Sequence, residues 1–146
     1  MPKRLKIPLA ALLLSVAAGC FLETMDASFA TAAEARAAGY VVKGWIPPWL
    51  PGDATDVREV HDLDTNVSEL SFAIPARDSL ELPPECKPVE HSGTVRAYIR
   101  RHWWPGETEL QQSYVFFRCP ADAADHVFVA VSKTGTRVLH WRTYAR

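Results

Sequence analysis

The pattern of apolar positions separates an N-terminal apolar run from a longer region in which apolar and polar side chains alternate. Residues 7–18 form a twelve-residue apolar run that contains one Ser. As a helix this run would span about 18 Å, which is short of the ~30 Å core of a bilayer. Lys3, Arg4 and Lys6 precede it. A positive start followed by a short apolar stretch is typical of an export signal, which we place at residues 1–19.

Alternation predicts β-strands in the rest of the chain. Residues 67–74 place Leu70, Phe72 and Ile74 on one side, which we expect to face the core. Three further strands are expected at residues 112–118, 126–132 and 136–144, where Val, Phe, Tyr and Trp are frequent. The short connection that ends in Gly135 predicts a β-hairpin between the last two strands, with a positive φ at this glycine.

Two segments have helical features. Thr31 and Glu34 have the spacing of a capping box, so one or two helical turns are expected in residues 31–38. Residues 20–39 are rich in Ala and poor in large apolar side chains, and we predict that they form a tether that is partly helical. Residues 94–104 carry apolar side chains at helical spacing and predict a second helix.

The arginines of that second helix, Arg96, Arg100 and Arg101, are interpreted as a solvated face, with phosphate binding as the alternative. Together the elements predict one α+β domain over residues 40–146, with a mainly antiparallel sheet, a C-terminal hairpin and one or two short helices. A length of 146 residues agrees with one domain. The formal charge of −1 excludes a nucleic-acid binder, which needs a basic face.

The end of the apolar run predicts lipidation. Residues 17–20 read Ala-Ala-Gly-Cys, which resembles the bacterial lipobox, where the Cys is lipidated and becomes the mature N-terminus. We expect a protein of the bacterial cell envelope that is anchored to the membrane through lipid on Cys20, at the outer membrane and facing the periplasm. Ordinary cleavage after Ala30 is the alternative. Removal of residues 1–19 takes away three of the 16 Lys and Arg residues and no acid, which leaves a charge of −4.

The cysteine count agrees with export. If Cys20 carries lipid, then Cys86 and Cys119 remain as an even pair in an oxidising compartment. We therefore predict a disulfide between Cys86 and Cys119. The spacing excludes a Cys-x-x-Cys redox motif, and two isolated Cys residues are too few for a thiolate zinc site.

Residues 40–51 read YVVKGWIPPWLP and hold large apolar side chains on a backbone stiffened by proline. We interpret Trp45 and Trp49 as side chains that pin this segment to the core, because buried aromatic side chains commonly dominate core packing. The alternative interpretation is an aromatic ridge that binds a ligand or a partner.

Residues 53–66 are acidic. Asp62, Asp64 and Asn66 match the first three ligand positions of a calcium loop, but Val67 and Ala73 stand where that loop needs Gly and Glu. We therefore predict no metal site here, but an acidic turn whose side chains bond to the local backbone. Asp53 or Thr55 is expected to cap a short helical turn before it.

Reaction motifs are missing from the sequence: it contains no Gly-x-Ser-x-Gly, no His-Glu-x-x-His and no dinucleotide fingerprint. We predict no catalytic residue, no metal ligand and no cofactor.

The block Gly44-Trp45-Ile46-Pro47-x-Trp49-Leu50-Pro51, followed by Asp62-x-Asp64-Thr65-Asn66, resembles a family of small bacterial proteins with a YbbD-type head domain, many of them predicted lipoproteins. The resemblance continues through Cys86, Trp103-Trp104-Pro105, Cys119 and Trp141. It implies a compact α+β fold and an envelope location, and it implies no catalytic residues.

The leading hypothesis is an envelope lipoprotein with a non-catalytic binding or structural domain and an envelope protein as partner. One alternative is a periplasmic hydrolase or metal-dependent enzyme around His61, Asp62 and Asp64. Another is an inhibitor or immunity-type protein that binds a toxin through residues 40–51. The residues expected to contact a partner are Trp45, Trp49, Asp62, Asp64 and Asn66.

Overall fold

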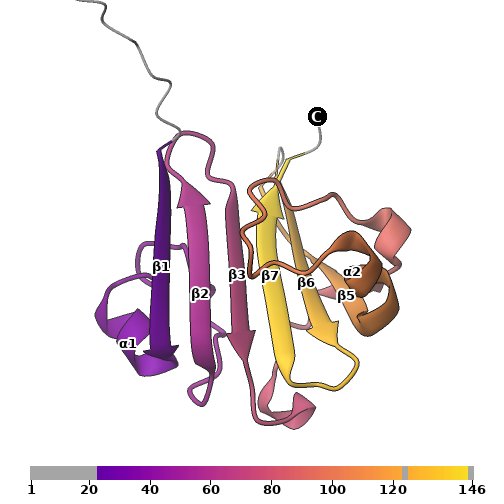
Figure 1. Ribbon diagram of the computed structural model, residues 1–146, viewed down its shortest axis with the longest axis horizontal. Helices are drawn as coiled ribbons and strands as arrows, with labels where there is room; N and C mark the ends of the chain where they lie inside the picture. Colours follow the sequence, from indigo (N-terminus) through magenta and orange to yellow (C-terminus); the bar gives the residue numbers. More distant parts are fainter. Residues whose placement is uncertain (1–22, 123–124, 145–146) are drawn as a thin grey trace, which may run out of the picture.

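A computed structural model of the protein describes residues 23–122 and 125–144. They form one seven-stranded sheet in the order β1-β2-β3-β7-β6-β5-β4, in which each pair of neighbours is antiparallel (Figure 1). The strands are β1 (Thr24–Thr31), β2 (Thr55–Asp62), β3 (Ser68–Ala73), β4 (Lys87–Val89), β5 (Tyr114–Cys119), β6 (His126–Ser132) and β7 (Arg137–Thr143). The helices are α1 (Ala32–Ala37) and α2 (Glu107–Ser113), with short 3₁₀ turns at Arg77–Ser79 and His91–Gly93. The predicted α+β class is confirmed.

The sheet consists of two meanders that meet in its middle. β1, β2 and β3 follow one another along the chain, and so do β4, β5, β6 and β7. The last strand returns to the centre and pairs with β3, from Ser68 opposite Arg142 to Ala73 opposite Arg137. In Figure 1 the indigo-to-magenta half and the orange-to-yellow half therefore lie side by side.

Each face of the sheet is covered by its own apolar cluster. On one face, which we call the α1 face, Leu70, Phe72 and Val129 pack with α1 and with residues 40–54. On the other, the strap face, Phe128 and Trp141 pack with α2 and with residues 94–106, which we call the strap. Because both faces are covered, the central strands are buried almost along their whole length.

The predicted C-terminal strands and the strand after the acidic turn are confirmed. β6 and β7 form the expected hairpin, and Gly135 between them has a φ of 75°. Leu70 and Phe72 point into the core and are fully buried. Helix α2 was not predicted, and it occupies residues that the strand pattern had partly assigned to β5.

The predicted tether is wrong in its central part, because Thr24–Thr31 is the edge strand β1 of the sheet. The domain therefore includes β1 and α1, which precede residue 40. Pairing with β2 from Thr24–Asp62 to Thr31–Thr55 provides the stabilisation that the small side chains do not. The helical turn was predicted correctly: Thr31 caps α1, with Oγ1 accepting from the Glu34 N–H at 3.2 Å.

The prediction of a helix over residues 94–104 is wrong, because the strap contains no α-helix. Its polar backbone groups bond to the sheet instead: the carbonyl oxygen of Val95 accepts from Trp141, and two amide groups donate to Glu69. Likewise, residues 55–62 form strand β2 and not a capped helical turn. Long-range contacts override local propensity in both segments.

The predicted disulfide is confirmed. Cys86 and Cys119 are bonded, which joins the end of β5 to the loop that precedes β4. β4 is a three-residue edge strand that contains Pro88, so it has few ladder hydrogen bonds. The disulfide holds this edge of the sheet together. Cys20, the predicted lipidation site, lies outside the described residues.

Candidate functional site in the strap face

The strap is fastened to the centre of the sheet by a buried carboxylate. Glu69 lies in β3 opposite Trp141 and is fully buried. Its Oε1 accepts from the Ile99 N–H at 2.6 Å, and its Oε2 accepts from the Arg100 N–H at 2.8 Å. Burial raises the pKa of Glu69, while these backbone hydrogen bonds and the nearby arginines oppose the increase. The buried carboxylate of Glu69 in β3 thus fixes a loop about thirty residues away in the chain.

The backbone at Arg100 is in the left-handed region, with a φ of 51°. Residues other than glycine adopt this conformation rarely, and it costs on the order of 1 kcal/mol. Here it accompanies a turn in which two consecutive amide groups converge on one carboxylate. The left-handed backbone at Arg100 and the hydrogen bonds to Glu69 therefore belong to one and the same turn.

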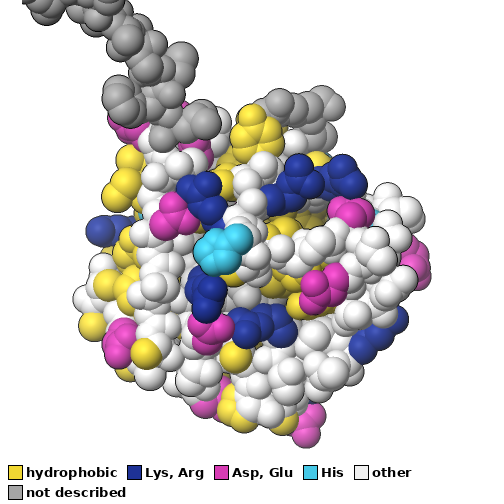
Figure 2. All heavy atoms as spheres, viewed as in Figure 1, with side chains coloured by type: hydrophobic (Ala, Val, Ile, Leu, Met, Phe, Trp, Pro, Cys, Tyr) yellow, Lys and Arg dark blue, Asp and Glu magenta, His cyan; other side chains and the backbone are white. Residues whose placement is uncertain are grey.

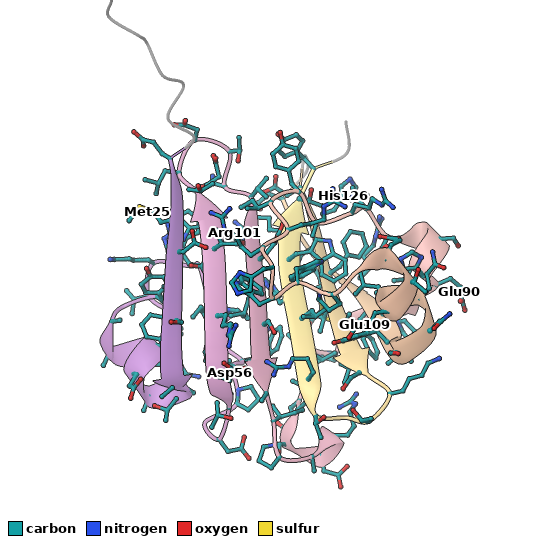
Figure 3. All side chains as sticks on the ribbon, viewed as in Figure 1. Met25, Asp56, Glu90, Arg101, Glu109 and His126 are labelled. Atoms are coloured by element: carbon teal, nitrogen blue, oxygen red, sulfur yellow. A yellow bond between two sulfur atoms is a disulfide. The ribbon has the colours of Figure 1, made fainter. Side chains whose placement is uncertain are left out.

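Two further contacts hold the strap. Arg101 forms a two-pronged ion pair with Asp26 of β1, with nitrogen–oxygen distances of 2.8 and 2.7 Å. Figure 3 shows Arg101 in front of the first half of the sheet. At the other side, Trp141 Nε1 donates to the Val95 carbonyl oxygen at 2.8 Å. The strap is therefore attached to β1, β3 and β7 at the same time.

Between the strap and α2 lies a cavity of about 330 Å³, which we call the strap cavity. Its floor consists of four buried apolar side chains, namely Trp104, Leu110, Phe116 and Trp141. The indole of Trp104 meets that of Trp141 edge to face, with ring centroids 5.6 Å apart. In Figure 2 yellow side chains lie at the bottom of a hollow that is bordered by dark blue ones.

The mouth of the strap cavity is charged. Glu107 is the first residue of α2; its Oε1 lies 2.9 Å from His91 Nε2, and its Oε2 lies 3.4 Å from Nε of Arg96. Arg100 also lines the cavity. Within residues 23–122 and 125–144, the Arg100 guanidinium forms neither a hydrogen bond nor an ion pair. The charge of Glu69 acts on Arg100, but among the described residues no carboxylate lies within ion-pair distance of this guanidinium.

The residues of the predicted enzyme alternative are not brought together. His61 and Asp62 are consecutive in β2, so their side chains leave opposite faces of the strand. Asp62 Oδ1 accepts from the amide groups of Asp64 and Thr65 at 3.0 and 2.9 Å, and Asp64 is exposed. Asn66 completes the turn with a φ of 58°. The prediction that the side chains of this turn bond to the local backbone is confirmed for Asp62, which is buried and not solvated, while no such bond of the Asp64 or Asn66 side chain is found among the described residues.

His61 has a different partner, Glu59, on the α1 face. Its Nδ1 lies 3.0 Å from both carboxyl oxygens of Glu59, and both residues are buried. Burial raises the pKa of Glu59 to about 9, with a smaller contribution from the charge of Asp26. Burial also lowers the pKa of His61. At neutral pH the Glu59 carboxyl group is therefore protonated and donates to the neutral imidazole.

The two tryptophans of residues 40–51 pack on the α1 face. Trp45 stacks on His61, and Trp49 contacts Phe72 and His140 at centroid distances of 6.4 and 5.8 Å. Both indoles are half-buried. Trp45 and Trp49 therefore attach residues 40–51 to the sheet. Their predicted contact with a partner stays a prediction, as it does for Asp62, Asp64 and Asn66.

His140 is a second buried histidine of the α1 face. It is 9% exposed, and its Nδ1 has no hydrogen-bond partner among the described residues. Burial lowers its pKa to about 4, and the charge of Arg142 acts in the same direction.

Among the described residues, no three His, Cys, Asp or Glu side chains are grouped so that they could hold a metal ion.

Sequence reasoning missed Glu69 and the cavity. The local signal for Glu69 is a glutamate on the side of the predicted strand opposite to Leu70 and Phe72. The sequence shows the arginines of residues 96–101 as a charged group, but its apolar spacing predicts that they lie on a helix.

No helix in the described part of the chain is long and apolar enough to cross a bilayer.

Comparison with known proteins identifies a family for part of the chain. The family model of the YbbD head domain matches residues 23–73, which confirms the resemblance for this part of the chain. Neither the curated proteins nor the solved structures gave a match. The matched residues are β1, α1, β2 and β3, the first meander of the sheet. The floor of the strap cavity comes from the other half, whereas Asp26 and Glu69, which fasten the strap, come from the matched half.

Proposed function

We propose that this chain, whose residues 23–73 match the YbbD head domain, is an envelope lipoprotein with a non-catalytic binding domain. The observation that carries the binding role is the strap cavity, about 330 Å³ in volume with an apolar floor and a charged mouth. The lining combines this apolar floor with charged side chains, among them Arg96, Arg100 and Glu107, and ligand sites commonly hold polar groups that fix a ligand above an apolar surface. Among the described residues that line the cavity, no nucleophile is paired with a base, and His91 lies against Glu107.

The envelope location is supported by the signal-like N-terminus and by the disulfide. Cys86 and Cys119 are bonded, and such bonds persist in oxidising compartments. The lipid anchor at Cys20 would tether the domain to the membrane, and the residues after Cys20 lead into β1 at the edge of the sheet. The partner is a molecule that reaches the strap face of this tethered domain.

Mass spectrometry of the protein from bacterial membranes tests the anchor. The expected mature chain begins at Cys20 and carries acyl groups, and Cys20→Ser leaves an unprocessed or soluble chain. Cys86→Ser is the matched control, because it removes a cysteine without affecting the N-terminus. An unmodified N-terminus beyond Cys20 would overturn the anchoring proposal.

Binding of a small neutral aromatic probe tests the binding role. We expect naphthalene-2-carboxamide to bind the mature protein and to shift the indole resonances of Trp104 and Trp141. Leu110→Trp fills the cavity and should abolish these shifts, while Val42→Trp, on a residue 91% exposed, should not. Shifts that persist in Leu110→Trp would place the probe elsewhere and contradict the proposal.

A further inference from the structure

We propose that the strap cavity takes a small organic anion with a flat apolar body, whose charged group lies at Arg100. This inference rests on the proposed binding function and names the class of ligand. The floor of the cavity fits the apolar body of such a ligand, because its four buried side chains, three of them aromatic, present hydrocarbon and ring surfaces. A cavity of about 330 Å³ has room for a molecule of one or two fused rings.

The charged side chains at the mouth of the cavity favour a ligand with a negative charge. Arg101 is neutralised by Asp26, and Glu107 is shared between His91 and Arg96. Arg100 remains without a partner for its guanidinium among the described residues. Arg100 is exposed, and a guanidinium binds a carboxylate or a phosphate in two parallel hydrogen bonds. The Glu69 carboxylate contacts the backbone of Arg100 and not its guanidinium, so an anion at the mouth would give the guanidinium the direct partner that it lacks.

The strap is prepared for this role before any ligand arrives. The backbone of Arg100 is held by the carboxylate of Glu69, at 2.8 and 3.0 Å from its two oxygens. The preceding residue, Ile99, bonds to the same carboxylate. A loop fastened in this way loses little conformational entropy on binding, which is the advantage of a preorganised site. Only the Arg100 side chain has to become ordered.

The test compares two probes that differ in charge alone, naphthalene-2-carboxylate and naphthalene-2-carboxamide, by calorimetric titration of the mature chain. We expect the carboxylate to bind about tenfold more tightly, the effect of a charge-assisted hydrogen bond. Arg100→Gln should reduce the affinity for the carboxylate to that for the amide and leave the amide unchanged. Arg142→Gln is the matched control, because Arg142 pairs with Ser68 in register and lies on the α1 face.

The outcomes separate this inference from the proposed function. Equal affinities for both probes, with binding lost in Leu110→Trp, would overturn the anion inference and leave the binding role. No binding of either probe would overturn both. A preference for the carboxylate that survives Arg100→Gln would also overturn the inference. Thermal melts verify that the variants fold, and Ala97→Leu replaces Leu110→Trp as the cavity-filling variant if the latter does not.

Discussion

The indole of Trp45 lies flat on the imidazole of His61, with ring centroids 3.7 Å apart and planes inclined by 8°. This contact joins residues 40–51 to β2. It also covers the hydrogen bond between His61 and Glu59, so the aromatic segment shields a buried polar pair from water. The Gly-Trp-Ile-Pro sequence is therefore a structural part of the α1 face.

Removal of the Trp45 ring should destabilise the fold. We expect Trp45→Ala to lower the free energy of unfolding by about 2 kcal/mol, less than the ~3–5 kcal/mol of a fully buried tryptophan because the ring is half-buried. Urea titration measures the change. Val42→Ala, at a residue 91% exposed, is the control and should change stability by less than about 0.5 kcal/mol. Equal stability of Trp45→Ala and the parent would show that the ring has no structural role.

Glu59 should make the protein less stable as the pH rises. Because its pKa is raised from 4.5 to about 9 in the folded state, the stabilisation from its protonated form is complete below pH 4.5 and is lost toward pH 9. The expected slope is about 1.4 kcal/mol per pH unit at most. Glu59→Gln keeps a hydrogen-bond donor and does not titrate, so its stability should not fall in this way. Urea midpoints at pH 6, 7, 8 and 9 compare the two proteins, and parallel curves would contradict the prediction.

His140 should make the protein less stable as the pH falls. Its pKa is lowered from 6.5 to about 4, so its contribution is complete above pH 6.5 and is lost as the pH falls toward 4. The loss amounts to roughly 3 kcal/mol. Between pH 4.5 and 6.5 this slope opposes that of Glu59, so it is best observed in the Glu59→Gln background. Adding His140→Phe to Glu59→Gln should remove the fall in stability toward pH 4. If the fall persists in the double variant, another group causes it.

Glu69 should control the order of the strap. Glu69→Ala removes the acceptor of the Ile99 and Arg100 amide groups, and we expect a loss of about 2–4 kcal/mol in stability. Hydrogen exchange at Ile99 and Arg100 should become much faster, while exchange in β6 should change only as far as global stability does. Glu69→Gln retains one acceptor oxygen, so its stability and its exchange rates should lie between those of the parent and those of Glu69→Ala. Unchanged protection of both amide groups in Glu69→Ala would refute the assignment.

Reduction of the disulfide should loosen the far edge of the sheet. The bond closes a loop of 33 residues, which corresponds to roughly 3–4 kcal/mol in the loop-entropy description. The double variant Cys86→Ala, Cys119→Ala should lose about this amount, measured by urea titration. A thiol assay on the denatured, unreduced parent should find neither Cys86 nor Cys119 reactive.

Much of the fold follows from local patterns. The strands at residues 67–74, 126–132 and 136–144 were predictable because alternation is a local consequence of strand geometry once one face is buried. The hairpin at Gly135 follows from the same local chemistry, and the disulfide from the cysteine count. β1 was missed because its small side chains give a weak pattern, and only pairing with β2 stabilises it.

The candidate site depended on contacts that no local pattern contains. Residues 94–104 have helical spacing, but Glu69, about thirty residues earlier, accepts the amide hydrogens that a helix would need. The spacing of apolar residues determined that this segment would bury one side. The tertiary structure decided that it would do so as an extended strap and leave a cavity beneath Arg100. The reason is that a buried carboxylate requires donors, and the strap supplies them at the cost of its own helix.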